Sequence, residues 1–264
     1  MKLTNPTNNP IILRPVQPNR GIEAAYKKRL QAMTQEMAKE YLREIKAALA
    51  QGGVIAQDSP LSFLKSLFLR LGNKWAALFD EAADNIATNF GTGINKATSA
   101  QINAELRRVG FAIEFKPSEY VSQAYQASIA ENVGLIKTIP AQFHSQIEGM
   151  VYRSVASGFD IAELTRQLKA TYGVTHKRAA FIAKDQTNKM TAVIERAQQQ
   201  ELGIEEAIWR HSHAGKEPRP SHVEANGKTY NIDKGMYLDG VWTWPGVEIN
   251  CRCLSLPIIP GFKQ

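Results

Sequence analysis

The sequence predicts a mainly α-helical protein with a helical N-terminal half and a small α+β module near the C-terminus. Between residues 23 and 203, apolar residues recur mostly at steps of three and four, the spacing of one face of a helix. From residue 204 to residue 257, glycines and prolines divide the chain into short pieces typical of strands and turns. This last stretch holds both cysteines, three of the five histidines and three of the four tryptophans. It is therefore either a functional site or a small fold tied together by polar groups.

Length and composition set the broad class. With 264 residues, 44% of them hydrophobic, the chain can bury a sizeable core as one large domain or two. It has no uninterrupted apolar run of the roughly 18 to 20 residues that span a bilayer, and its N-terminus lacks the apolar segment of a signal peptide. We therefore expect a cytoplasmic protein whose two cysteines, Cys251 and Cys253, are reduced, because so tight a disulfide ring would be strained.

The net charge of +7 is concentrated at the N-terminal end. Residues 1–50 contain nine Lys and Arg against four Glu, a balance of +5, whereas residues 51–170 contain eleven basic and eleven acidic residues. Such an asymmetry indicates a polyanion or an acidic protein surface as partner, with a solvated helix face as the alternative.

The N-terminal half is predicted as a flexible arm over residues 1–20 and a helical domain over residues 21–131. The arm is rich in proline and asparagine, which favours an extended or disordered chain. A helix with an apolar stripe follows and ends at Gly52-Gly53; the stripe is predicted to be core or a surface for a partner helix, and it comprises Tyr26, Leu30, Met33, Met37, Tyr41, Ile45 and Leu49.

Three further helices are expected at 60–71, 75–86 and 94–109, then a short strand or extended link at 110–115 and a helix at 118–132. The stretch Phe90-Gly91-Thr92-Gly93 resembles a phosphate loop only superficially, because no Gly-Lys-Ser/Thr continuation follows and no strand precedes it.

The C-terminal domain is predicted at 132–264, with helices over 140–203 and the turn-rich module over 204–257. An apolar connector at 132–139 leads to Pro140, which suits the first turn of a helix. Asp160 and Glu163 have the spacing of a capping box, and the helix that they open is expected to stop at Gly173. Thr175 is then expected to cap a last helix that ends at Gly203.

Basic residues on two helices are candidates for contact with DNA phosphates, although a solvated face remains the alternative for both sets. The candidates are Lys27, Lys28 and Arg29 in the N-terminal half, and Lys177, Lys184, Lys189 and Arg196 opposite the apolar side of the last helix.

Zinc binding is the first chemistry to consider in the module, because five of its residues are zinc-ligand types: His211, His213, His222, Cys251 and Cys253. Four of them, His211, His222, Cys251 and Cys253, form the candidate ligand set. Structural zinc sites favour two cysteines separated by two to four intervening residues, whereas Cys-Arg-Cys has only one, points alternate side chains in opposite directions along an extended chain and supplies only two sulfurs. We therefore expect no metal and no other cofactor, and keep these four residues as the alternative.

Catalysis needs a nucleophile beside an oriented base. Ser221-His222, the cysteines and Arg219 or Arg252 make a hydrolase or a metal-free ribonuclease conceivable. Since no spacing is diagnostic, we expect no enzymatic activity. The alternative is a metal- or histidine-dependent nuclease acting on DNA.

Ordered signatures over residues 132–257 resemble the phage head morphogenesis family, the Mu F-like minor capsid proteins. They are the run 132–139, Ala179 with Phe181 to Lys189, Gly203-Ile204, Ile208-Trp209-Arg210, Arg219-Pro220-Ser221-His222, Asn226-Gly227-Lys228 and Asn250-Cys251-Arg252-Cys253.

This resemblance implies a non-enzymatic minor head protein of a tailed bacteriophage, located inside the head near the portal and in the host cytoplasm during assembly. It implies a role in DNA packaging or ejection. The expected partners are the portal protein and non-specific duplex DNA, with scaffolding or major capsid protein as further candidates and no membrane.

Some relatives carry a Cys-x-x-Cys pair where this chain has Arg219 to His222, so a four-cysteine zinc site is not expected. Other relatives carry toxin or nuclease domains appended beyond the shared module; because this sequence continues for seven residues after Pro257, we expect no such domain here.

Two further expectations concern packing and partner contacts. The module is predicted to be held together by burial and hydrogen bonds of its motif residues: Trp209, Arg219, His222, Gly227, Asn250, Cys251, Arg252 and Cys253. The amphipathic helix 23–49 is the predicted portal contact, the competing possibility being that its stripe packs against the helices that begin near Pro60 and Trp75.

Overall fold

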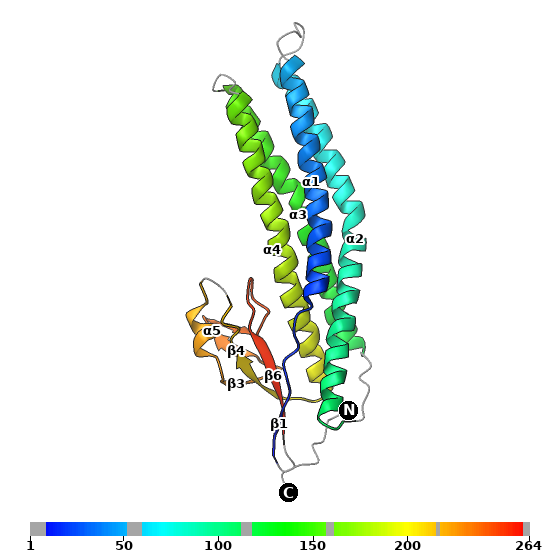
Figure 1. The fold of residues 1–264 in the computed structure, drawn as a ribbon, viewed down its shortest axis with the longest axis vertical. Helices are drawn as coiled ribbons and strands as arrows, with labels where there is room; N and C mark the ends of the chain where they lie inside the picture. Colours follow the sequence, from blue (N-terminus) through cyan, green and yellow to red (C-terminus); the bar gives the residue numbers. More distant parts are fainter. Residues whose placement is uncertain (1–8, 52–59, 112–117, 157–160, 215–216, 261–264) are drawn as a thin grey trace. The chain divides into compact units, whose positions relative to one another are not determined.

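Four long helices account for most of the chain. The computed structural model describes residues 9–51, 60–111, 118–156, 161–214 and 217–260. Its long helices are α1 (Arg20–Gln51), α2 (Pro60–Arg108), α3 (Glu119–Ala156) and α4 (Ile161–Glu201), followed by a short α5 (Pro220–Glu224) among small strands (Figure 1). The predicted fold class, mainly α with a small α+β module at the C-terminal end, is confirmed. None of the described helices combines the length and apolar character needed to cross a membrane.

The chain divides into two compact units made of segments distant in sequence. Unit 1 comprises Met1–Glu23, Asn89–Ala130 and Lys184–Gln264, and unit 2 comprises Ala24–Thr88 and Glu131–Ala183. Each long helix contributes residues to both units. The units are thus discontinuous in sequence, whereas the predicted domains were continuous stretches.

Unit 1 contains the strands. An antiparallel four-stranded sheet has the order β1 (Ile11–Ile12), β6 (Leu254–Ile259), β2 (Glu206–Arg210) and β3 (Thr229–Asn231); β4 (Met236–Leu238) and β5 (Val241–Thr243) form a separate hairpin. Buried residues alternate along β2 and β6, as expected for strands with one face on a core. That core gathers around Trp209, Tyr230 and Ile232 and includes residues of α2 and α4 such as Leu106 and Ala197.

The N-terminal arm is extended, as expected, but from Asn9 it is docked rather than free. Its strand β1 pairs with β6, and the Leu13 N–H donates to the Pro257 carbonyl at 2.9 Å (Figure 1). Leu13 and Val16 are buried. These contacts correct the prediction of a flexible arm for residues 9–19; residues 1–8 lie outside the described residues.

The three helices expected between residues 60 and 109 are one continuous helix, α2. Gly91 and Gly93 do not interrupt it, because each lies where another side chain of unit 1 comes close. A Cβ on Gly91 would lie 3.0 Å from Ile129 of α3, and one on Gly93 would lie 3.3 Å from Ile22 of α1. The rejected phosphate loop is therefore helical backbone. The expected strand at 110–115 is not seen at Gly110 and Phe111, where α2 ends, and its remainder lies outside the described residues.

Helices α3 and α4 are also longer than predicted. Pro140 lies inside α3 rather than at a first turn, and the predicted connector before it is helical, with Ile136 and Ile139 fully buried. Gly173 lies inside α4, and the Thr175 hydroxyl donates to the Thr171 carbonyl within that helix instead of capping a new one. Burial of these helices outweighs the cost of a proline or glycine in their interior.

Helix α4 does end where predicted. Gly203 has a φ of 71°, and the Ile204 and Gly203 N–H groups donate to the Gln199 and Gln200 carbonyls, which closes the helix in a Schellman motif. The capping residue Asp160 lies outside the described residues.

The apolar stripe of α1 belongs to the core of unit 2. Tyr26, Leu30, Met37, Tyr41 and Ile45 are 4% exposed or less. The Tyr41 ring packs edge-on against Phe143 of α3 at 5.2 Å, and its hydroxyl lies 2.9 Å from Nδ1 of His144. The stripe is therefore unavailable as a portal contact, which corrects that prediction in favour of internal packing.

Candidate functional site

The candidate site lies in the module after α4, where a tight turn and a short helix place its residues. Gly227, with a φ of 81°, donates its N–H to the Trp209 carbonyl, and the Trp209 N–H donates to the Lys228 carbonyl. Pro220 begins α5 with its fixed φ and brings His222 to the fully buried Trp209 ring, with centroids 5.1 Å apart. Trp209 and His222 are thus buried against each other.

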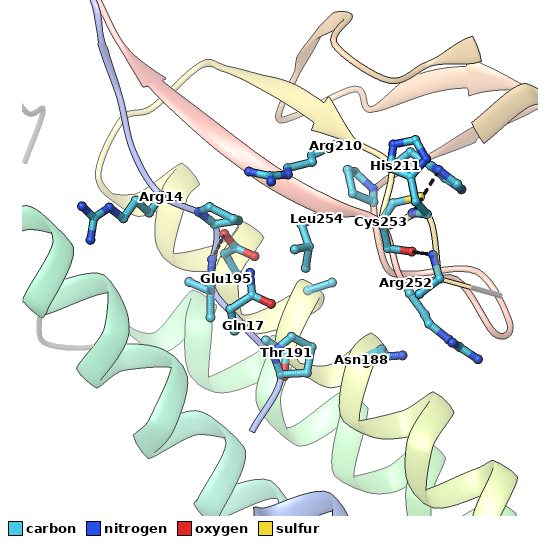
Figure 2. A pocket seen from close by; sticks show the side chains of 18 of the residues that line it. Arg14, Gln17, Asn188, Thr191, Glu195, Arg210, His211, Arg252, Cys253 and Leu254 are labelled. Carbon is cyan, nitrogen blue, oxygen red and sulfur yellow. Dashed lines mark hydrogen bonds between the residues drawn. The ribbon is translucent and has the colours of Figure 1, made fainter. Parts of the chain in front are cut away.

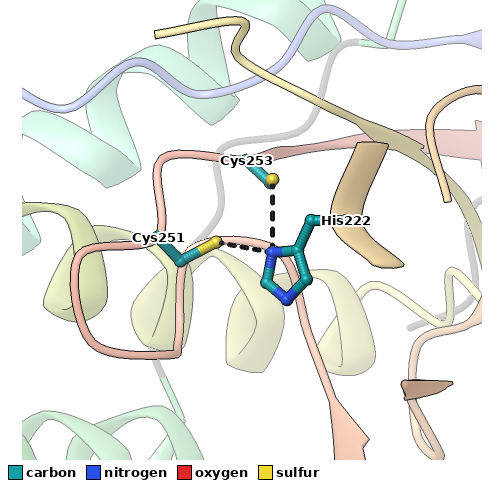
Figure 3. A group of neighbouring side chains, drawn as sticks. All are labelled: His222, Cys251 and Cys253. Carbon is teal, nitrogen blue, oxygen red and sulfur yellow. Dashed lines mark hydrogen bonds between the residues drawn. The ribbon is translucent and has the colours of Figure 1, made fainter. Parts of the chain in front are cut away.

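Figure 3 shows the central group, a histidine facing two cysteines. Nδ1 of His222 lies 3.5 Å from the sulfur of Cys251 and 3.7 Å from that of Cys253. All three residues are buried, and their ligand atoms lie within 4.8 Å of one another. This His–Cys cluster could hold one metal ion.

The His–Cys cluster corrects the spacing argument against a shared cysteine site. Cys251 to Cys253 precede β6 and are not in a strand, so their side chains need not alternate. Asn250, with a φ of 60°, turns the chain immediately before them. The Cys-Arg-Cys segment can therefore direct both sulfurs to one histidine nitrogen.

The Glu248 carboxylate contacts both His222 and Arg219. Oε1 of Glu248 lies 3.4 Å from Nε2 of His222, and Oε2 of Glu248 lies 3.2 Å from Nε of Arg219. Arg219 also donates from a terminal nitrogen to the Ile249 carbonyl at 3.0 Å. Arg219 therefore orients the segment that carries Glu248 and the cysteines.

Helix α4 fixes the cysteine segment from the other side. The Asn250 N–H donates to Oδ1 of Asp185, and Nδ2 of Asn188 donates to the Cys251 carbonyl at 3.4 Å. The Gly246 N–H points to the Cys251 sulfur at 3.3 Å. Sequence reasoning did not assign Asp185, Asn188 or Glu248 to the site, although the first two lie in a signature of the resemblance.

The contacts within the His–Cys cluster favour charge separation. The hydrogen bond with Cys253 and the contact with His222 lower the pKa of Cys251, against the effect of burial. The contact with Cys251, aided by Glu248, raises the pKa of His222. The Cys251 sulfur is therefore favoured as a thiolate, the form of cysteine that binds metal ions.

Beside the cluster lies a polar cavity of about 890 Å³, shown in Figure 2. Its lining includes Arg14 of the N-terminal arm, Arg210 of β2 and the buried Glu195 of α4. Glu195 accepts the Val16 N–H at 3.4 Å, and burial raises the pKa of its carboxyl to about 8. Figure 2 places Glu195 near the arm, away from Cys253 and His211.

The predicted DNA-contacting residues are divided between the two units. Lys27, Lys28, Arg29 and Lys177 are exposed in unit 2. Lys184, Lys189 and Arg196, in unit 1, are only partly exposed. The Arg196 guanidinium stacks on the Trp244 ring at 4.0 Å, a packed arrangement that corrects its assignment to a solvent-facing DNA surface.

The remaining predicted residues are close to the cluster. His211 is buried and lines a second cavity of about 750 Å³ together with Asn250, Arg252 and the cluster residues, but it is not among the three grouped ligands. Arg252 is partly buried.

Residues 145–256 match the family model described as Phage Mu protein F like protein. The chain is 25% identical over 257 residues to an uncharacterized protein of Haemophilus influenzae, covering 95% of this chain and 56% of that protein. The chain thus spans about half the length of this relative. No solved structure matches the chain. The matched range runs from the C-terminal part of α3 to β6 and includes the whole His–Cys cluster.

Proposed function

We propose that the chain is a minor capsid protein of a tailed bacteriophage, because residues 145–256 match the family model described as Phage Mu protein F like protein. It binds the portal vertex and DNA inside the head during packaging or ejection. The family match is the observation that carries this proposal. The exposed basic side chains of unit 2 and the exposed aromatic side chains of the β4–β5 hairpin support it.

The DNA contact is assigned to the basic cluster of unit 2, which we define as Lys27, Lys28, Arg29 and Lys177. All four side chains are exposed. Gln31 of α1 donates from Nε2 to the His176 carbonyl of α4 at 3.3 Å, so the two helical segments that carry these residues lie together. Such a cluster without groups for reading bases binds phosphates without sequence preference.

Binding of fluorescent duplexes at several salt concentrations tests the DNA contact. Replacement of Lys27, Lys28 and Arg29 by Ala should weaken binding equally for unrelated sequences and reduce the slope of log K against log salt by about 2.7, at roughly 0.9 for each phosphate that is no longer neutralised. A matched triple variant of exposed lysines elsewhere, Lys65, Lys228 and Lys234, should change neither. Sequence-selective binding, or equal losses in both variants, would contradict the assignment.

The portal contact is assigned to the β4–β5 hairpin of unit 1. Tyr237, Val241 and Trp242 are 59%, 53% and 57% exposed, and the two aromatic rings lie 5.5 Å apart. Exposed aromatic side chains grouped in this way are typical of protein contacts. The hairpin replaces the buried stripe of α1 as the proposed docking surface.

Co-purification with the portal protein of the same phage tests this surface. Trp242→Ala should reduce capture of the portal protein at least tenfold, because aromatic anchors contribute on the order of 2 kcal/mol or more to interfaces. Leu69→Ala, which changes a 65% exposed residue of α2, is the matched control and should leave capture unchanged. Undiminished capture by a folded Trp242→Ala protein would rule the hairpin out.

A further inference from the structure

We propose that His222, Cys251 and Cys253 bind a zinc ion that ties helix α5 to the segment preceding β6. The two parts are 29 and 31 residues apart in sequence at the contacts concerned. An ion between them would join the Arg219–His222 and Asn250–Cys253 motifs into one unit.

The two nitrogen–sulfur distances within the cluster are those of ligands around one ion. Zinc bonds to sulfur at about 2.3 Å and to imidazole nitrogen at about 2.05 Å, so tetrahedral geometry separates the two ligand atoms by about 3.6 Å. The observed separations of Nδ1 from the two sulfurs are 3.5 and 3.7 Å. A zinc ion therefore fits without movement of the histidine relative to either cysteine.

Hydrogen bonding alone gives a poorer account of the same group. Nδ1 of His222 carries either one lone pair or one N–H, so it can form one well-aligned hydrogen bond and not two. Two sulfurs at nearly equal distance from that one nitrogen are what a shared ion produces (Figure 3).

The surroundings supply the outer contacts that zinc ligands commonly have. Nε2 of His222 is buried without a well-formed hydrogen bond in the described part of the chain, and it faces the Glu248 carboxylate at 3.4 Å. With Nδ1 on the ion, the proton sits on Nε2 and points to this carboxylate. The Gly246 N–H at 3.3 Å stabilises the Cys251 sulfur as a thiolate.

The fourth ligand is assigned to water. The adjoining cavity of about 750 Å³ reaches all three proposed ligands, so solvent can complete the tetrahedron. His211 lines the same cavity, but its Nδ1 already accepts the His213 N–H at 3.2 Å, and it is outside the group of close ligand atoms. Three protein ligands with one open position is an established zinc arrangement.

Metal analysis of the full chain, purified reduced and reloaded after chelation, tests the proposal. Wild type should retain about one zinc per chain, and X-ray absorption at the zinc edge should show two sulfur ligands and two nitrogen or oxygen ligands. Cys253→Ser and His222→Asn should lower zinc affinity at least tenfold. His213→Ala, which removes an exposed histidine of the same module, is the matched control and should bind as wild type.

Measurement on the wild type alone keeps the test valid if a ligand variant fails to fold. Chelation should lower its melting temperature, and added zinc but not magnesium should restore it, because binding to the folded state alone stabilises that state. A folded, reduced wild type that takes up no zinc overturns the proposal. So does a native Cys251–Cys253 disulfide found by mass spectrometry, or a spectrum without sulfur ligands.

Discussion

Truncating Trp209 to alanine should destabilise unit 1 by about 3–5 kcal/mol, the usual cost of removing a large buried aromatic side chain. The Trp209 ring is fully buried, and it packs edge-on against His222 at 5.1 Å and Tyr230 at 6.0 Å. A buried aromatic side chain removes roughly 150–250 Å² from water, which at about 25 cal/mol per Å² corresponds to about 4–6 kcal/mol. Since a domain is stable by about 5–15 kcal/mol in total, this loss removes a large part of the stability of unit 1 and is enough to unfold it if that stability lies at the low end of the range.

Denaturant unfolding followed by near-ultraviolet circular dichroism measures this loss. Trp242→Ala is the matched control, because Trp242 is 57% exposed and its removal should change the free energy of unfolding by about 0.5 kcal/mol or less. If Trp209→Ala unfolds at the wild-type denaturant concentration, the module is not held together by this burial and the structural interpretation of its motif residues is wrong.

Three further predictions address other parts of the chain. Burial raises the pKa of the Glu195 carboxyl to about 8, so the folded state keeps a proton that the unfolded state releases near pH 4.5. The free energy of unfolding should therefore fall by a few kcal/mol as pH rises from about 4.5 to 8. Denaturation measured at several pH values should show this fall in the wild type and not in Glu195→Gln. A dependence that persists unchanged in Glu195→Gln would refute this assignment. Tyr41→Phe should lower the free energy of unfolding by about 1 kcal/mol, because it removes the hydroxyl that hydrogen-bonds to His144. Tyr41→Ala should lower it by about 3–5 kcal/mol, because it also removes the buried ring. Equal stability of the wild type and both variants would mean that the α1 stripe is not part of the core. A plasmid-nicking assay should show no activity above buffer with or without divalent ions, whereas nicking that His222→Ala abolishes would establish the nuclease alternative.

Sequence periodicity predicted the presence of the helices more accurately than it predicted their ends. Gly173 and Pro140 are breakers by local propensity, yet both lie inside helices. Burial of neighbouring residues, such as Ile136 and Ile139 before Pro140 and Leu168 before Gly173, outweighs these local preferences and depends on partners distant in sequence. Gly203 was predicted correctly because the cap it makes is local.

The module was foreseen as a concentration of polar and aromatic residues, but its geometry was not. The spacing of Cys251 and Cys253 argued against a shared site only on the assumption of extended backbone, and the positive φ of Asn250 removes that assumption. The contact of Glu248 with His222 joins residues whose nearness no local pattern reveals. The resemblance, in contrast, was found from ordered signatures without any geometry, and a family model of the same description matches residues 145–256.

Quantitative mass spectrometry of gradient-purified procapsids and mature heads tests the proposed function most directly. The host should be grown with the phage to which we propose that this chain belongs, and tails and host ribosomes should be fractionated in parallel as controls. We predict a few copies of the chain per particle, co-purifying with the portal protein in heads and absent from tails and ribosomes. Heads that contain the portal protein but none of this chain, at any stage of assembly, would contradict the proposed function.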